Sequence, residues 1–200
     1  MTKMTILYEN HESPNNKSLE IGWGLSIFIE IDNKKILFDS GWNGDILLRN
    51  CQRLNIDLSS VDAFIISHPH WDHMGGVPQV IPRLKNAVVY FPEEFSSNQI
   101  TEIKRMNPSL TIKINKIGSI LEEVSQNLAL TSTVLGEMNI KEEALIIKNK
   151  DGTGTLVVGC LHPGLERFVQ DAESFAPISS IVGGLHGFKN FTFLESRKIS

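Results

Sequence analysis

The sequence predicts a layered α/β fold, built as a single domain over residues 1–200. Strand-sized apolar runs alternate with segments whose apolar residues recur at helical spacing. The 200 residues include 41% hydrophobic and 21% charged residues, a composition that supports a packed core of ordinary size. No internal repeat or low-complexity linker divides the sequence.

The first half is predicted to form six strands with helices between them. β-rich or continuously apolar runs predict strands at residues 2–8, 24–31, 35–40, 61–67, 87–91 and 110–114. Asp32-Asn33-Lys34 has turn chemistry and predicts a hairpin. Helical spacing predicts a helix over residues 45–54, and Pro92 followed by two glutamates predicts a helix start that runs to about Met106. Residues 75–84, which contain two prolines, are predicted to be a short helix or an irregular segment.

The second half repeats this alternation. Strands are predicted at residues 129–131, 144–148, 155–159 and 179–182. Asn149-Lys150-Asp151-Gly152 predicts a hairpin turn, and residues 164–175 carry apolar side chains at the spacing of an amphipathic helix.

Composition narrows the function classes. No apolar run approaches the roughly 20 residues of a membrane span, and the N-terminus lacks the pattern of a signal peptide. Cys51 and Cys160 are too few for a disulfide framework and suit a reducing compartment, so we expect a cytoplasmic protein without a membrane partner. The net charge is −4 and no basic block is present, so we expect a small-molecule substrate and no nucleic acid. The sequence does not indicate an oligomeric state.

The run His68-Pro69-His70-Trp71-Asp72-His73 carries the strongest functional signal. Imidazole and carboxylate are the usual ligands of zinc and similar divalent metals. In an extended loop, residues i and i+2 point to the same side, so His68 and His70 are predicted to bind one ion, with Asp72 and His73 reaching a neighbouring ion. The run directly follows a predicted buried strand, the position where open α/β sheets bind ligands.

Two later strands also end near a histidine. The block Gly159-Cys160-Leu161-His162 makes His162 a predicted metal ligand and Cys160 a supporting residue, and Gly183-Gly184-Leu185-His186 makes His186 a further predicted ligand. Asp39, at the end of an apolar strand, is predicted to support the site by hydrogen bonding to a ligand histidine or to loop amides; by itself it reads more readily as a turn residue.

Together these motifs resemble the metallo-β-lactamase superfamily. The run from Ser67 to Gly76 looks like its HxHxDH signature, and Phe38-Asp39-Ser40-Gly41 resembles its upstream Asp motif. The resemblance implies an αββα sandwich with one or two metal ions at one edge. Within the superfamily, the layout is similar to a branch of metal-dependent hydrolases related to the archaeal dihydropterin ribofuranosyl-aminobenzene phosphate synthase.

Two departures from the family pattern stand out. The predicted strand at 155–159 ends in Gly-Cys where a bridging Asp is expected, so either His162 takes over a ligand role or one metal position is under-coordinated. The chain also stops at Ser200, soon after His186, which we interpret as a C-terminal truncation of the domain.

The leading hypothesis is a hydrolase that uses a metal-activated water on an ester, lactone, amide or phosphate-type substrate, with Asp72 as the catalytic residue that orients the water or accepts its proton. One or two zinc ions are expected; manganese, iron and nickel accept the same ligands. The alternatives are a transferase like the dihydropterin synthase and a non-catalytic metal-binding protein. Substrate-binding residues are not identified: Trp42 and Trp71 are candidates for the substrate entrance, although large aromatics more often serve in packing.

Overall fold

The computed structural model describes residues 2–14, 16–118 and 122–185. The contacts of the chain group into two compact units, Met1–Ile114 and Asn115–Ser200. Each unit combines a mixed sheet with helices, which confirms the predicted α/β class. The single domain predicted over residues 1–200 stays a prediction.

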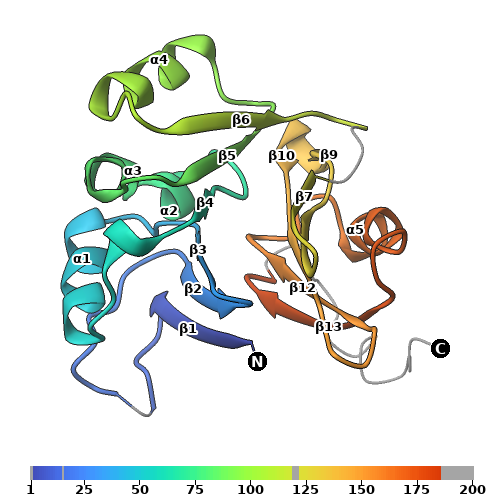
Figure 1. The fold of residues 1–200 in the computed structure, drawn as a ribbon, viewed down its shortest axis with the longest axis horizontal. Coiled ribbons are helices and arrows are strands. Elements are labelled where there is room, and N and C mark those ends of the chain that lie inside the picture. Colours follow the sequence, from blue (N-terminus) through green and yellow to red (C-terminus); the bar gives the residue numbers. More distant parts are fainter. Residues whose placement is uncertain (1, 15, 119–121, 186–200) are drawn as a thin grey trace. The chain divides into compact units, whose positions relative to one another are not determined.

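The first unit is built on a six-stranded sheet (Figure 1). Its strands, in spatial order, are β1 (Lys3–Tyr8), β2 (Ser26–Ile31), β3 (Lys34–Phe38), β4 (Ala63–Ile65), β5 (Val88–Pro92) and β6 (Thr111–Asn115). The pairs β1–β2 and β2–β3 are antiparallel, whereas β3–β4 and β4–β5 are parallel. The β2–β3 turn has Asp32 and Asn33 at positive φ, as a tight two-residue hairpin requires.

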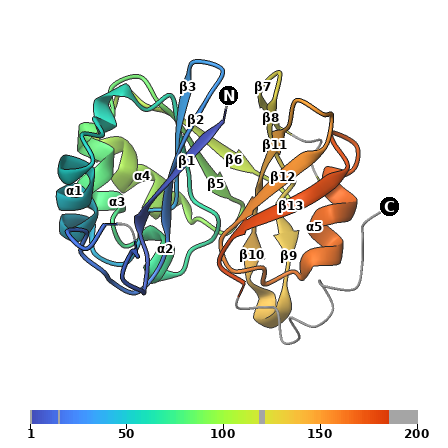
Figure 2. The same cartoon turned by 90° about the horizontal axis from the view of Figure 1, so that it is seen from below.

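Helices of the first unit lie on one side of its sheet (Figure 2). They are α1 (Gly44–Arg53), α2 (Trp71–Met74), α3 (Val77–Val80) and α4 (Ser97–Met106), with short 3₁₀ turns at η1 (Leu58–Ser60) and η2 (Ile81–Arg83). Asn43 caps α1 by accepting hydrogen bonds from the amides of Asp45 and Ile46.

The predicted start of α4 at Pro92 is wrong. Pro92 is the last residue of β5, and the helix begins only after Ser96. Ser96 and Gln99 form a capping box, in which each side chain satisfies the other residue's backbone amide. A true cap thus outweighs the preference of proline for a first helical turn.

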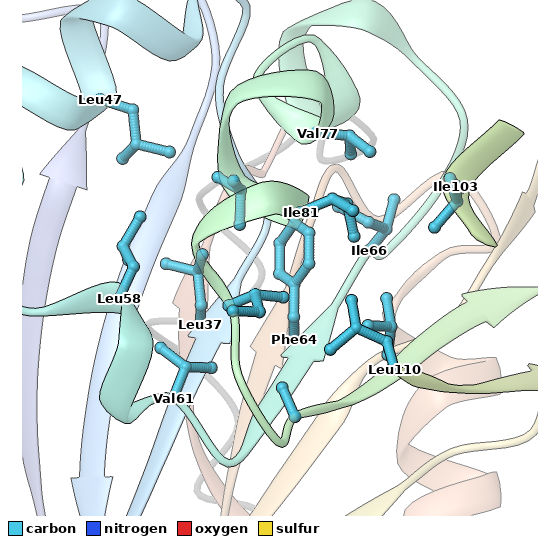
Figure 3. Close-up of a cluster of buried hydrophobic side chains, with 14 of the residues drawn as sticks. Leu37, Leu47, Leu58, Val61, Phe64, Ile66, Val77, Ile81, Ile103 and Leu110 are labelled. Atoms are coloured by element: carbon cyan, nitrogen blue, oxygen red, sulfur yellow. The ribbon is translucent and has the colours of Figure 1, made fainter. Parts of the chain in front are cut away.

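The core of the first unit lies between the sheet and these helices. Leu37 and Phe64 extend from neighbouring strands toward Leu47 of α1, Val77 of α3 and Ile103 of α4 (Figure 3). All five side chains are at most 4% exposed. The helices are therefore held against the sheet by the burial of apolar side chains.

Cys51 lies on the buried face of α1 and is 3% exposed. Burial raises the pKa of its thiol to about 12, so at pH 8 almost no thiolate is present. We expect Cys51 to escape alkylation by iodoacetamide in the native protein and to react fully in urea. Peptide mass spectrometry measures both states, and rapid native labelling of Cys51 would contradict the burial of α1.

The second unit has a five-stranded and a two-stranded sheet. The larger sheet has the order β13 (Ile178–Gly183), β12 (Gly154–Val158), β11 (Leu145–Lys148), β8 (Leu128–Leu130) and β7 (Glu122–Ser125). The smaller pairs β9 (Val134–Leu135) with β10 (Lys141–Glu142), on either side of the 3₁₀ turn η3 (Glu137–Asn139). The pair β12–β13 is parallel; the other pairs are antiparallel.

Helix α5 (Leu165–Ala172) covers one face of the larger sheet. Phe168 and Ala172 of this helix are fully buried against Ile146, Leu156 and Val158. Among the described residues, none of the helices has the length and apolar character needed to cross a lipid bilayer.

Candidate metal centre

The predicted ligand run begins at His68, three residues beyond the end of β4 at Ile65. Because β4 lies in the interior of the sheet and is parallel to both neighbours, its C-terminal end opens at an edge where β3 and β5 also end. His68 and His73 are buried, at 0% and 2% exposure. His70 is extended and directly precedes the four-residue helix α2, which carries Asp72 and His73.

Asp39 organises this run from the end of the neighbouring strand β3. Its carboxylate is fully buried and accepts the Ser67 backbone N–H at 2.7 Å on Oδ1. On Oδ2 it accepts the Ser67 hydroxyl at 2.7 Å and the Nδ1–H of His73 at 2.6 Å. Asp39 also adopts φ 57°, a left-handed conformation that is uncommon outside glycine. The sequence assigned Asp39 two kinds of partner, a ligand histidine and a loop amide, and the structure contains both contacts.

The hydrogen bonds assign which ring nitrogens face the site. His73 donates Nδ1–H to Asp39, so its Nε2 carries the lone pair. The Ser67 hydroxyl gives its proton to Asp39 and therefore accepts from Nδ1 of His68, 2.9 Å away, which leaves the lone pair of His68 on Nε2. A buried carboxylate that fixes the tautomer of a ligand histidine is the usual support of a metal site.

The ring nitrogens converge. His68 Nε2 lies 3.1 Å from Nδ1 of His70, and the ring centroids of His68 and His73 are 4.2 Å apart. His68 offers a ring nitrogen within 4.8 Å of one on His70 and of one on His73. His68 is thus paired with two neighbouring imidazoles, and imidazole nitrogens are donors that zinc and similar divalent cations prefer.

Asp72 completes this half of the site. Its carboxylate Oδ2 is 3.5 Å from Nε2 of His73, and the side chain is 14% exposed. Burial alone would raise its pKa, but when His73 is protonated on both nitrogens, its hydrogen bond and charge, with the charge of His70, outweigh burial and hold the pKa below its usual value. The carboxylate is therefore ionised at neutral pH, as a ligand or a proton acceptor must be.

Backbone contacts fix the helix that carries Asp72. The Asp72 carbonyl accepts a hydrogen bond from the Leu25 amide at 3.2 Å, and the His73 carbonyl accepts one from the Ser40 amide at 2.7 Å. Gly24 has φ 119°, and a Cβ at this position would overlap the Asp72 carbonyl. Only glycine permits this approach.

Replacing Gly24 by alanine should therefore displace Asp72. We expect the free energy of unfolding to fall by about 2 kcal/mol or more, and metal affinity to fall with it. Urea unfolding and a competitive metal titration measure the two effects. Gly152→Ala is the matched control, because Gly152 also has a positive φ (86°) but no atom within 4 Å of an added Cβ. If both variants lose the same stability and metal affinity, the effect comes from backbone strain at positive φ and not from the overlap with Asp72.

In the second unit, Cys160 and His162 lie on the loop that follows β12. This loop wraps around the buried carboxylate of Glu142: Oε1 accepts the backbone amides of Gly159, Cys160 and Leu161 at 2.8 to 3.1 Å, and Oε2 accepts that of His162 at 2.8 Å. Leu161 has φ 61° within this loop. Sequence reasoning missed Glu142, whose only signal is an acidic pair, Glu142-Glu143, just before an apolar strand.

The structure thus brings Asp39, His68, His70, Asp72 and His73 together within the first unit. It places Cys160 and His162 two residues apart on one loop of the second unit, with Cys160 buried. His186 lies outside the described residues. The ligand roles of His162 and His186 and the supporting role of Cys160 stay predictions.

Similarity to known proteins supports the family assignment that the motifs suggest. A sequence profile of the metallo-β-lactamase superfamily matches residues 23–99, which include Asp39 and the whole 68–73 run. An uncharacterized protein of Methanocaldococcus jannaschii is 30% identical over 186 residues, spanning 82% of this chain and 72% of the relative. The chain belongs to the metallo-β-lactamase superfamily. Members of this superfamily are mostly enzymes, among them hydrolases, and the fold generally binds divalent metals.

Other relatives span different activities. The M. jannaschii 7,8-dihydropterin-6-methyl-4-(β-D-ribofuranosyl)-aminobenzene-5'-phosphate synthase is 27% identical over 82% of this chain and 70% of its own length. Human tRNase Z, short form, has a TM-score of 0.58 at 12% identity and covers 86% of this chain and 74% of its own. A quorum-quenching N-acyl homoserine lactone lactonase has a TM-score of 0.53 at 18% identity over 80% and 78%. At these identities the two solved structures show the shared fold alone.

Proposed function

We propose that this protein is a metal-dependent hydrolase acting on an ester, lactone, amide or phosphate-type small molecule. The observation that carries the proposal is the Asp39 network, which directs Nε2 of His68 and of His73 toward the site beside His70. Such a network supports ligand histidines and has little purpose in a structural loop.

His68, His70 and His73, with the Asp72 carboxylate, would hold the metal, and zinc suits this donor set best. A divalent ion here supplies Lewis acidity that activates water near neutral pH and polarises the bond under attack. Asp72 would orient the attacking water or accept its proton, because its carboxylate stays ionised beside His73. Asp39 keeps the proton of His73 on Nδ1 and so keeps Nε2 available as a donor atom.

Metal removal provides the first test. Protein freed of metal by chelation should lose hydrolysis across a panel of esters, lactones, amides and phosphodiesters, and added zinc or manganese should restore it. His68→Ala should abolish stoichiometric metal uptake measured by titration calorimetry. His11→Ala is the control, since that side chain is 87% exposed and pairs with Glu9 in the N-terminal segment. Hydrolysis that survives complete chelation would refute the proposal.

The predicted ligands beyond the 68–73 run can be tested in the same titration. We propose His162 and His186 as further ligands, so alanine at either should lower the affinity or the number of bound ions. Unchanged uptake in both variants would limit the site to His68, His70, Asp72 and His73.

A second candidate is transferase activity like that of the archaeal synthase, favoured by the 27% identity over 82% of this chain. Pyrophosphate release from a pterin diphosphate in the presence of an aminobenzene riboside phosphate would distinguish it from hydrolysis. One tightly bound ion without turnover in either assay would instead favour a non-catalytic metal-binding protein.

A further inference from the structure

All three tryptophans of the chain are on the surface of the first unit. Trp23, Trp42 and Trp71 are 60%, 56% and 65% exposed. An indole has a large apolar surface, and leaving it in water forgoes about 1.5 to 3 kcal/mol of burial for a large side chain. Packing, the commoner use of large aromatics, therefore does not explain them.

The three tryptophans come from different segments that meet at the metal motif. Trp71 lies between the predicted ligands His70 and Asp72. Trp23 precedes Gly24 and Leu25, which contact the Asp72 carbonyl. The carbonyl oxygens of Trp42 and Trp71 both occupy the space that a Cβ on Gly75, the C-cap of α2, would need. Close backbone approaches thus place Trp23 and Trp42 beside the four-residue helix that begins with Trp71.

We propose that these tryptophans, here called the tryptophan rim, bind a planar aromatic or heteroaromatic ring of the substrate by stacking. The proposal rests on the hydrolase function above, because it concerns the substrate of the same site. Stacking is the interaction that indole faces offer beyond simple apolar contact, and ring pairs prefer offset or edge-to-face geometry. Because Trp71 is flanked in the chain by His70 and Asp72, we expect the group to be cleaved to be attached to that ring or close to it.

The observations favour a small molecule over the other possible occupants of the rim. Nucleic-acid bases also stack on aromatics, but such sites run along basic grooves, and this chain has a net charge of −4 without a basic block. Self-association through the rim is distinguished by sedimentation. The rim therefore fits a small ring-bearing molecule best.

The rim can be observed directly, because it contains every tryptophan in the chain. Protein labelled with 5-fluorotryptophan should give three ¹⁹F resonances, assigned from Trp23→Phe, Trp42→Phe and Trp71→Phe. Two probes share one carbon skeleton and differ in aromaticity: 2-naphthamide and its decahydro analogue. We expect 2-naphthamide to shift at least two resonances and to bind at least tenfold more tightly than the decahydro probe.

Variants separate stacking from folding. Trp71→Leu should weaken 2-naphthamide binding at least tenfold, whereas Trp71→Phe should keep it within about threefold, and both should keep the metal stoichiometry of the wild type. Equal affinity for the two probes, or no effect of Trp71→Leu, would overturn the proposal. Shifts that depend on protein concentration without a probe, with a dimer in sedimentation, would overturn it in favour of self-association. Binding of 2-naphthamide by protein that takes up no metal would contradict the hydrolase and leave the stacking intact.

Discussion

Replacing Asp39 by alanine is expected to lower metal affinity by about 10- to 100-fold, the usual effect of losing a residue that supports metal ligands. The side chain of Asp39 accepts three hydrogen bonds inside the protein, from two donors of Ser67 and from Nδ1 of His73. Without it, both tautomers of His73 become accessible and its ring loses its fixed orientation. The free energy of unfolding should also fall, by about 3 kcal/mol or more, because buried donors lose an ionic acceptor.

Asp39→Asn tests the role of the carboxylate without changing the backbone conformation of residue 39. Asparagine tolerates the positive φ and can still accept the Ser67 amide, but its NH₂ group would face the donors of Ser67 and His73. We therefore expect Asp39→Asn to lose metal affinity like alanine while losing less stability. Asp32→Asn is the matched control, an exposed aspartate at positive φ in the β2–β3 turn. Competitive chelator titration and urea unfolding measure both quantities, and wild-type metal affinity in Asp39→Asn would refute the role assigned to Asp39.

The fold was largely predictable because its strands are continuous apolar runs. The β2–β3 hairpin and α1 followed from turn residues and helical spacing, and both are present. The strands β9 and β10 were missed: each is two residues long, one apolar (Val-Leu) and the other charged (Lys-Glu), which is too short to show a periodic signal. Their pairing depends on tertiary contacts.

The site was predictable where its residues are adjacent in sequence and not where they act at a distance. The 68–73 run is recognisable as a metal-binding motif because three histidines and an aspartate lie within six residues. Asp39 read more readily as a turn residue when taken alone, because its partners Ser67 and His73 are 28 and 34 residues away. The role of Glu142 could not be predicted for the same reason, since the backbone amides that donate hydrogen bonds to it lie 17 to 20 residues later. An acidic pair ordinarily indicates a solvated surface, and only the fold reveals this one as buried.

Replacing Glu142 by alanine is expected to have the largest effect on the second unit, a loss of about 4 kcal/mol or more in the free energy of unfolding. Four backbone amides, those of residues 159 to 162, would lose their acceptor, and each buried unsatisfied donor costs about 1 to 3 kcal/mol. These bonds also hold Leu161 in its left-handed conformation, whose strain is of order 1 to 3 kcal/mol. Without the carboxylate the loop should relax, and with it the positions of Cys160 and His162.

Glu142→Gln tests the hydrogen bond to His162 separately from the other three, because it removes an acceptor from that amide alone. A glutamine can accept the three amides bound by Oε1, but its NH₂ group would then face the amide of His162. We expect a smaller loss, about 1 to 3 kcal/mol, with amide chemical-shift changes concentrated at His162. Glu173→Gln, at an exposed glutamate just after α5, is the control and should change the stability little. If Glu142→Ala unfolds at the urea concentration of the wild type, the carboxylate does not hold the loop. If the second unit loses stability while His162 keeps its amide shift in Glu142→Gln, Glu142 stabilises the unit without positioning the histidine.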